Sequence, residues 1–152
     1  ATYLEFMHAR GRQAPRVLPY PLARHVMPGR CRVGTLEVIA TPVPHVPDSV
    51  GYRIEAAGKT LVYAGDCGPG REVVELARGA DLLILECSLP PGKQTAAHLN
   101  PQQAALLATM AGAKQLLLTH FPPEANSARA VQVAREAGLS CQAATDGLEI
   151  TL

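Results

Sequence analysis

Apolar and polar residues alternate in the first clearly patterned part of the chain, as is typical of β-strands. Residues 33–43, VGTLEVIATPV, partly alternate and predict one strand. The runs GYRIEAA and TLVYAGD then lie on either side of the Gly58-Lys59 pair. Two β-rich runs around a glycine-containing turn predict a hairpin. The pattern therefore indicates three strands before the chain reaches Asp66.

Further along, continuous apolar runs alternate with helical segments. DLLILECS and KQLLLTH predict strands that are buried on both faces. GPGREVVELARGA predicts a short helix with Pro69 near its start and Gly79 near its end. SARAVQVAREAGL predicts another helix, with Ser127 as its candidate cap and Gly138 as its stop.

Residues 100–112, NPQQAALLATMAG, have the strongest helix-start signals. Asn100 is a good N-cap, Pro101 fits the first helical position, and Gln103 occupies the capping-box position. From residue 36 onward the predicted order is β, β, β, α, β, α, β, α, β, β, where the last two strands, CQAA and LEITL, flank the turn signal Asp146-Gly147. This order predicts an α/β domain of one sheet and about three helices, too few to cover both sheet faces.

The amino-terminal part has a different character. Residues 1–13 read as the end of an amphipathic helix, and residues 14–30 contain four prolines, which make regular structure improbable. The length of 152 residues predicts a single domain over 1–152. We expect this domain to be incomplete, because the chain lacks an initiator methionine and begins as if inside a helix.

Composition excludes several classes of protein. A formal net charge of +1 gives no bulk signal for a nucleic-acid or membrane-surface partner. No apolar run approaches the ~18 residues of a membrane span, so no membrane association is expected. None of the four cysteines forms a CxxC pair, which favours reduced thiols in a cytoplasmic protein over a disulfide scaffold.

The candidate chemistry lies where predicted strands end. Asp66 closes LVYAGD, His120 closes QLLLTH, His45 follows the strand at 33–43, and His98 precedes the cap of helix 100–112. Sites in α/β sheets assemble at the carboxyl ends of strands, and two histidines with one aspartate suit Zn²⁺, Mn²⁺ or Fe²⁺.

Each residue alone also has a simpler interpretation. Asp66, which follows a strand and lies between Gly65 and Gly68, is as often a turn former or cap, and a lone histidine at a strand end is more often structural. Cys67 is a possible metal neighbour of Asp66, although small buried cysteines are commoner, and Cys87 is interpreted as core packing. Glu86 is harder to dismiss, because an acid at the end of a buried strand needs a partner.

Together, the segments HVPDSVGYRIEAAGKTLVYAGDCGP, LLILECSL and HLNPQQAALLATMAGAKQLLLTHFPP resemble the second half of metallo-β-lactamase-fold hydrolases, in the family's order. The closest subgroup looks like ribonuclease Z and its phosphodiesterase-like relatives. The resemblance covers residues 33–152 and implies the C-terminal half of an αββα sandwich. Residues 1–32 would then be a helix end and a proline-rich loop.

The resemblance implies roles for five residues. His45, Asp66 and His120 match metal ligands, with Asp66 as the carboxylate that bridges two metals. His98 matches a proton donor in scissile-phosphate chemistry, and Glu86 matches the acid that orients it. Cys67 stands where threonine is usual and Cys87 where alanine is common. The family's HxHxDH motif, which supplies most ligands to both metals, is absent from these 152 residues.

The implied function is metal-dependent hydrolysis, in which a metal-activated water attacks a phosphodiester or an ester. The 152 residues alone are expected to bind metal weakly and to have little activity, because HxHxDH is absent. Two zinc ions are expected in a complete site, with manganese or iron as alternatives. RNA is one candidate substrate, and relatives suggest a homodimer. The alternative is a non-catalytic α/β interaction or regulatory module that has lost its metal site. A doubly wound nucleotide-binding domain is disfavoured, because the sequence contains neither GxGxxG nor GxxxxGK[ST].

Overall fold

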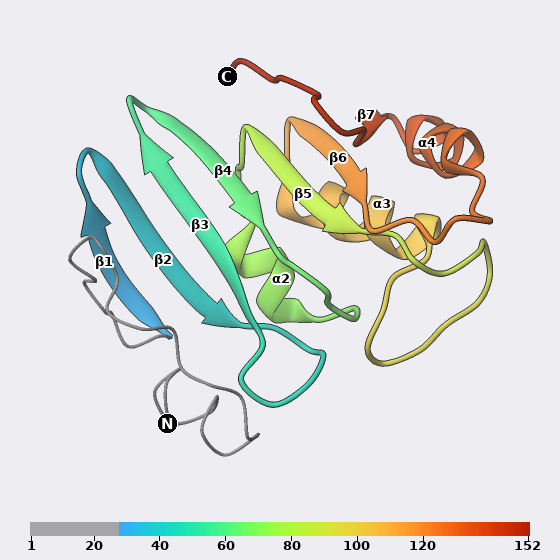
Figure 1. Cartoon of the computed structure of the whole chain (residues 1–152), viewed down its shortest axis with the longest axis horizontal. Coiled ribbons are helices and arrows are strands. Elements are labelled where there is room, and N and C mark those ends of the chain that lie inside the picture. Colours follow the sequence, from blue (N-terminus) through green and yellow to red (C-terminus); the bar gives the residue numbers. More distant parts are fainter. Residues whose placement is uncertain (1–27) are drawn as a thin grey trace, which may run out of the picture.

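A computed structural model describes residues 28–152, which form one seven-stranded sheet and three helices (Figure 1). The strands are β1 (Gly29–Val33), β2 (Leu36–Pro42), β3 (Val50–Ala56), β4 (Lys59–Tyr63), β5 (Leu82–Glu86), β6 (Gln115–Thr119) and β7 (Ser140–Ala143). The helices are α2 (Arg71–Leu76), α3 (Pro101–Ala111) and α4 (Ser127–Glu136). The predicted α/β class is therefore confirmed.

The strands lie in the sheet in their order along the chain. β1 to β4 pair as antiparallel neighbours, and β4 to β7 pair as parallel neighbours. The connections between parallel strands contain α2, α3 and α4 in turn. Parallel crossovers are almost always right-handed, so a sheet that grows in one direction receives all of its helices on the same face. The result is one β layer covered by one α layer (Figure 1).

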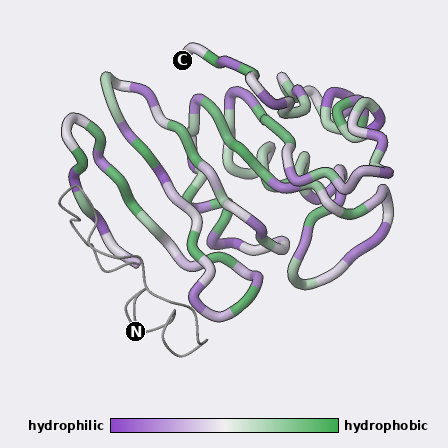
Figure 2. Tube along the Cα trace, viewed as in Figure 1, coloured by the Kyte–Doolittle hydropathy of each residue, from purple (hydrophilic) through white to green (hydrophobic). Residues whose placement is uncertain are grey.

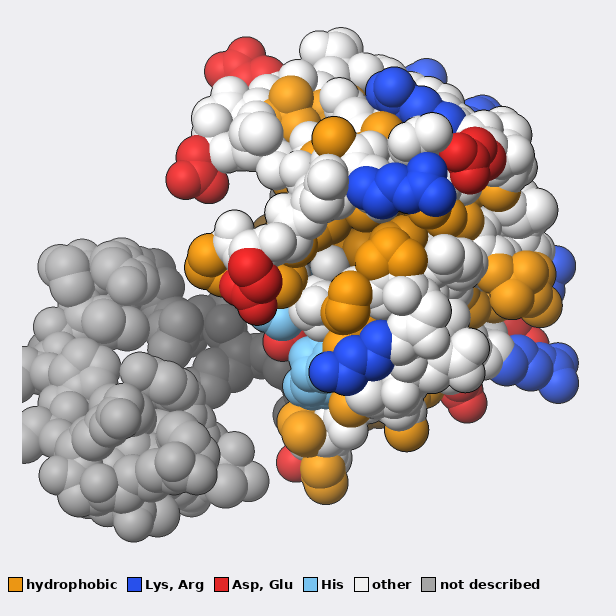
Figure 3. Space-filling view, turned by 90° about the vertical axis from the view of Figure 1, so that its right-hand side faces the viewer, with side chains coloured by type: hydrophobic (Ala, Val, Ile, Leu, Met, Phe, Trp, Pro, Cys, Tyr) orange, Lys and Arg blue, Asp and Glu red, His pale blue; other side chains and the backbone are white. Residues whose placement is uncertain are grey.

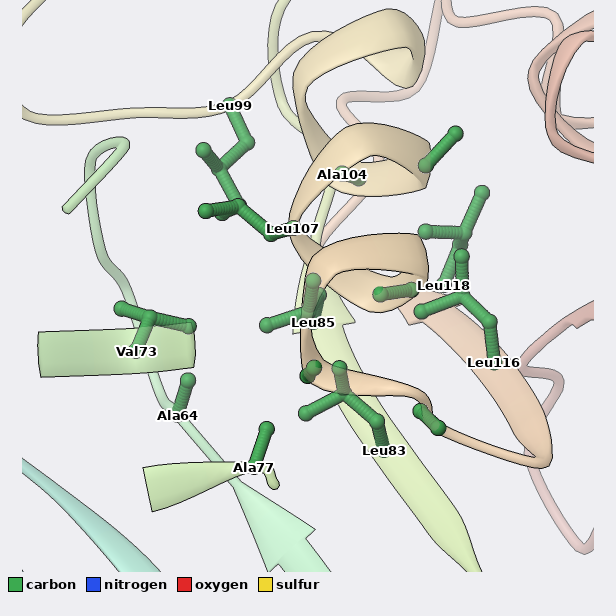
Figure 4. Close-up of a cluster of buried hydrophobic side chains, with 14 of the residues drawn as sticks. Ala64, Val73, Ala77, Leu83, Leu85, Leu99, Ala104, Leu107, Leu116 and Leu118 are labelled. Atoms are coloured by element: carbon green, nitrogen blue, oxygen red, sulfur yellow. The ribbon is translucent and has the colours of Figure 1, made fainter. Parts of the chain in front are cut away.

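The hydrophobic core lies between this sheet and the helices. Leu83 and Leu85 of β5 and Leu118 of β6 are fully buried and belong to the same cluster as Ala104 and Leu107 of α3 (Figure 4). Figure 2 shows the corresponding apolar stretches along β5 and β6. Burial of each such leucine stabilises the folded state by about 1.5–3 kcal/mol. The central strands and α3 therefore contribute much of the stability of the fold.

The opposite face of the sheet has no helix from residues 28–152 on it, yet it is rich in apolar side chains. Tyr52, Tyr63 and Ile84 form one row across three strands through the observed register. Ile54 and Leu61 pair in the row beside it. Tyr63 is exposed and the other four are half-buried. The expectation that the helices do not cover both faces thus holds for the described residues.

Helix α3 begins as the sequence predicts. The Asn100 side chain accepts a hydrogen bond from the Gln103 amide at 2.8 Å, and the Gln103 side chain accepts one from the Asn100 amide at 3.1 Å. Asn100 is only 1% exposed, and its Nδ2 also donates to the Lys93 carbonyl at 2.6 Å. One side chain therefore caps the helix and fixes the loop that precedes it.

Three predictions about local structure are wrong. Residues 29–32 belong to strand β1 and not to the proline-rich loop, because Gly34 and Thr35 form a tight turn that pairs β1 with β2. Asn126, not Ser127, caps α4 and accepts from the Arg129 amide at 2.9 Å. The expected helix end at 1–13 and most of the loop at 14–30 lie outside the described residues.

The third error concerns the carboxyl-terminal hairpin. Gly147 forms the expected turn, with φ +79° and a Leu148 amide that donates to the Thr145 carbonyl. The segment LEITL that follows forms no strand. β7 is already paired with β6, and LEITL does not pair with its other edge, so the turn signal does not produce a hairpin.

Three loops pack together beyond the ends of β2, β4 and β5. The Gly68 amide donates to the Pro44 carbonyl at 2.5 Å. A Cβ added to Gly68 would lie 1.8 Å from the Ala96 carbonyl oxygen, a distance that no side chain tolerates. Only glycine therefore allows the loop after β4 to approach the loop before α3 this closely.

A polar link also joins the other ends of the central strands. Asp81 Oδ2 accepts from the Thr60 amide at 2.8 Å, and Asp81 Oδ1 accepts from Lys114 Nζ at 2.8 Å. The hydrogen bond from Lys114, followed by the one from Thr60, holds the pKa of Asp81 below its ordinary value. This carboxylate ties the beginnings of β4, β5 and β6 together.

The Asp81 link predicts a pH-dependent contribution to stability. A carboxylate with a lowered pKa in the folded state stabilises the protein above its ordinary pKa, and this contribution is lost as pH falls through the folded-state value. Asp81→Asn should therefore lower the urea midpoint at pH 7 and lower it by less at about pH 2. Asp146→Asn, at an exposed turn, is the control at both pH values. An equal effect of Asp81→Asn at the two pH values would contradict this account.

The packing at Gly68 predicts a large cost for its smallest substitution. Gly68→Ala should lower the free energy of unfolding by more than about 2 kcal/mol, because backbone must move to admit the methyl group. Gly92→Ala is the matched control, since Gly92 has φ +81° but no atom within 4 Å of an added Cβ. That variant should lower the free energy of unfolding by only about 1–2 kcal/mol, the cost of placing alanine in a left-handed backbone conformation. Urea denaturation of both variants tests the difference, and equal losses would refute it.

Candidate active site

Strand direction brings the candidate residues to one edge of the sheet. β2 and β4 are both antiparallel to β3, so they point the same way, and β5 and β6 are parallel to β4. The carboxyl ends of these four strands therefore lie at the same edge. His45, Asp66 and His120 follow three of them, and Glu86 is the last residue of β5.

His45 and His98 are oriented by hydrogen bonds to their Nδ1 atoms. His45 Nδ1 lies 2.9 Å from the Ala97 carbonyl oxygen, and a carbonyl only accepts, so Nδ1 carries the proton. The Nε2 lone pair of His45 is then available to a ligand. His98 Nδ1 lies 2.5 Å from Glu86 Oε1, which holds its ring in the same manner.

Glu86 is the one charged side chain among residues 28–152 that is buried in this way. It is 1% exposed, and its second oxygen, Oε2, accepts from the Ser88 amide at 2.9 Å and from the Ser88 hydroxyl at 2.8 Å. A buried carboxylate needs such donors, because removal from water is costly unless hydrogen bonds compensate. The expectation that Glu86 requires a partner is therefore met twice, by His98 and by Ser88.

Asp66 and His120 form the exposed part of the cluster. Asp66 Oδ1 lies 3.1 Å from His120 Nδ1, and their side chains are 44% and 46% exposed. Gly65 before Asp66 has φ +64°, and His120 itself has φ +58°, a conformation uncommon for residues other than glycine. The backbone thus turns sharply at both positions as soon as the strands end.

The three described histidines lie next to one another. The ring centroids of His45 and His98 are 4.9 Å apart in an edge-to-face arrangement, and those of His98 and His120 are 6.0 Å apart. Figure 3, which views the molecule from the right-hand side of Figure 1, shows histidine side chains at the surface. Five side chains far apart in the sequence, His45, Asp66, Glu86, His98 and His120, therefore form one connected cluster.

The most compact group of possible metal ligands is not the one that the sequence predicts. Within residues 28–152, the group whose ligand atoms all lie within 4.8 Å of one another is Glu86, His98 and His120. The trio His45, Asp66 and His120 is brought into the same cluster, but it does not form such a compact set. Two of the compact group, Glu86 and His98, already bind each other, and the Asp66 carboxylate contacts His120.

Cys67 lies beside the cluster but belongs to the core. Burial raises the pKa of its thiol to about 12, and the negative charges of Glu86 and then Asp66 add to the rise. Burial likewise raises the pKa of Cys87 to about 12, with a further contribution from Glu86. Both thiols are neutral at neutral pH and pack in the hydrophobic cluster, as the sequence predicts for Cys87.

Sequence reasoning missed Ser88, although this residue has two contacts to Glu86. The only available signal was its position two residues after a buried acid, where a serine often bonds back to its neighbour. It also missed the Ala96-Ala97 segment, which contacts His45 and closely approaches Gly68 through backbone atoms. Backbone contacts of this kind leave no mark on residue type.

No helix among the described residues is both long and apolar enough to cross a bilayer.

Comparisons with known proteins concern the fold and the family. An uncharacterized protein of Mycobacterium tuberculosis (strain ATCC 25618 / H37Rv) is 39% identical over 94 residues, which are 60% of this chain and 34% of that protein. The crystal structure of the metallo-beta-lactamase fold protein YhfI from Bacillus subtilis matches with a TM-score of 0.76 and 26% identity, covering 81% of this chain and 53% of that one.

Human tRNase Z, short form, matches with a TM-score of 0.63 and 28% identity, covering 80% of this chain and 45% of that one. The chain thus spans about a third of the length of the curated relatives that it matches first. The family model described as "Beta-lactamase superfamily domain" matches residues 7–121. The fold, the order of the motifs and these matches together establish that this chain belongs to the metallo-β-lactamase superfamily, among relatives that include ribonuclease Z enzymes.

Proposed function

We propose that the protein is a metal-dependent phosphodiesterase related to ribonuclease Z. The observation that carries this proposal is the cluster of His45, Asp66, Glu86, His98 and His120 at one edge of the sheet. In the proposal, His45, Asp66 and His120 bind metal. His98, oriented by Glu86, donates a proton to the leaving group.

The donor set fits a divalent metal. Imidazole and carboxylate are ligands of zinc, and they also accept manganese or iron. The hydrogen bond from His45 Nδ1 to the Ala97 carbonyl is the type of contact that orients a metal-binding histidine and leaves Nε2 free. When bound, such a metal polarises the scissile phosphate and activates water. Three residues make up only part of the two-zinc site that we propose, because HxHxDH does not occur in the sequence.

The pair of His98 and Glu86 supports acid catalysis. Glu86 Oε1 accepts from His98 Nδ1, so the other ring nitrogen, Nε2, is left to exchange a proton with a substrate. In the proposal, a water oxygen forms a bond to phosphorus while the bond between phosphorus and the leaving oxygen breaks, and the leaving oxygen takes the electron pair together with a proton from His98 Nε2. Glu86 stabilises the charged ring before the transfer and keeps its orientation.

The substrate class is proposed from the relatives and from the charge. A tRNase Z among the similar structures supports a phosphodiester, and RNA is one candidate. A net charge of +1 gives no bulk signal for a nucleic-acid partner, so a smaller phosphodiester or an ester is the other candidate. We further propose that residues 33–152 correspond to the C-terminal half of an αββα sandwich, and that the protein is a cytoplasmic homodimer.

The second candidate is a non-catalytic interaction or regulatory module. The observation in its favour is that HxHxDH is absent from the sequence. The two candidates differ in metal content and turnover, so one set of measurements separates them.

The test compares the purified wild-type protein with Asp66→Asn, which keeps the shape of the side chain and removes its charge. We expect these 152 residues alone to bind metal weakly and to have little activity, because HxHxDH is absent. A wild-type protein that also carries the missing half should contain zinc by elemental analysis and hydrolyse bis(p-nitrophenyl) phosphate. Asp66→Asn should lower both metal content and kcat, the latter by about 100-fold or more, because a lost ligand costs at least as much as a lost supporting contact.

The control is Asp146→Asn, which alters an exposed carboxylate in the turn after β7 and should change neither quantity. Hydrolysis by wild-type protein after removal of all metal would overturn the proposal. Wild-type protein that neither retains metal nor hydrolyses any diester would favour the non-catalytic module.

A further inference from the structure

The carboxylate of Glu86 is held at both of its oxygens, and each oxygen has a different partner. Oε1 accepts from His98 Nδ1 at 2.5 Å. Oε2 accepts both the amide of Ser88 at 2.9 Å and its hydroxyl at 2.8 Å. Since an ionised carboxylate has no proton to donate, Ser88 is the donor in both contacts.

We propose that Ser88 is a positioning residue for the pair of Glu86 and His98. The inference rests on the proposed function, in which His98 protonates the leaving group. In this proposal, the Ser88 hydroxyl restricts rotation of the Glu86 carboxylate and keeps Oε1 directed at His98 Nδ1. The ring of His98 is thereby held with Nε2 directed at the substrate.

The amide and the hydroxyl of Ser88 have separable roles. The terminal torsion of a glutamate is broad, so one hydrogen bond defines the plane of the carboxylate poorly. A second donor on the same oxygen, from a different direction, restricts this rotation. Among the described residues, the contacts to Glu86 are those from Ser88 and His98. The amide remains in any variant of Ser88, so removal of the hydroxyl should loosen Glu86 without leaving it unsatisfied.

The surroundings of Ser88 make this a functional test and not a test of folding. Ser88 is half-buried and lines a cavity of about 480 Å³ together with Leu89, Phe121 and other residues. Loss of its hydroxyl therefore creates no sealed void, and water has room to enter. The fully buried core leucines of β5 and β6 do not depend on this side chain, so Ser88→Ala should fold.

The nature of the leaving group separates positioning from a general structural effect. A p-nitrophenolate ion is stable and departs with little help from an acid. A ribose hydroxyl leaves as a strongly basic alkoxide unless it receives a proton as the bond to phosphorus breaks. Weaker control over His98 should therefore slow the second substrate more than the first, because general acid catalysis matters most where the leaving group is basic.

The experiment compares wild type, Ser88→Ala and Ser88→Thr on bis(p-nitrophenyl) phosphate and on a dinucleoside monophosphate. We expect Ser88→Ala to lower kcat on the dinucleotide by about 10-fold, with KM within about twofold. On bis(p-nitrophenyl) phosphate its kcat should fall by only about twofold. Ser88→Thr keeps the hydroxyl and should restore both values. Ser140→Ala, at the exposed start of β7, is the control and should behave as wild type.

Equal losses on the two substrates, an unchanged kcat on the dinucleotide, or no recovery with Ser88→Thr would each overturn the inference. A second readout does not depend on activity, so a failure of the proposed function is distinguishable. In ¹H NMR of protein with ¹⁵N-labelled histidine, the Nδ1 proton of His98 is identified by its loss in His98→Gln. Its resonance should shift in Ser88→Ala and return in Ser88→Thr, and an unchanged resonance in Ser88→Ala would contradict the proposed contact.

Discussion

The rest of the structure depends on one constraint, the common direction of four strands. The candidate residues follow these strands or end them. β2, β4, β5 and β6 point the same way, so the loops that follow them meet at one edge of the sheet. The same parallel arrangement, with right-handed crossovers, places α2, α3 and α4 on a single face. The location of the candidate site and the one-sided helical layer are thus two results of one topology.

Within this frame, short contacts between loops define the detailed geometry. Because Gly68 has no side chain, the backbone of the loop after β4 packs directly against the backbone of the loop before α3. Asn100 joins the start of α3 to the loop that contains His98. The carboxylate of Glu86 is buried, and Ser88 and His98 satisfy its oxygens. Asp66 and His120 are more exposed.

Local signals predicted most of the fold. The capping box at Asn100 and the buried run of β5 depend on neighbours in the sequence, and both were predicted. The turn between β3 and β4 was predicted at Gly58-Lys59 and lies one residue earlier, at Ala57-Gly58, because Lys59 already pairs with Ala56. Strand β1 was missed because Pro28 and Gly29 suggest a loop, whereas pairing with β2 supplies its stability. The expected strand in LEITL failed for the opposite reason, since its turn forms without a strand that pairs with it.

The candidate site was predictable in position but not in its contacts. Strand ends indicated where Asp66, His120 and Glu86 would lie, and the family resemblance supplied their possible roles. The contacts from Ala97 to His45 and from Ser88 to Glu86 arise from the packing of loops and from a local turn, and residue type alone does not reveal them. The roles of His45, Asp66 and His120 as metal ligands stay a prediction.

Anomalous X-ray diffraction from crystals grown with zinc, recorded above and below the zinc absorption edge, tests the central claim most directly. The account predicts an anomalous peak about 2.0–2.2 Å from His45 Nε2 or from the Asp66 carboxylate and His120. A protein saturated with zinc whose peaks all lie away from these three side chains would contradict it.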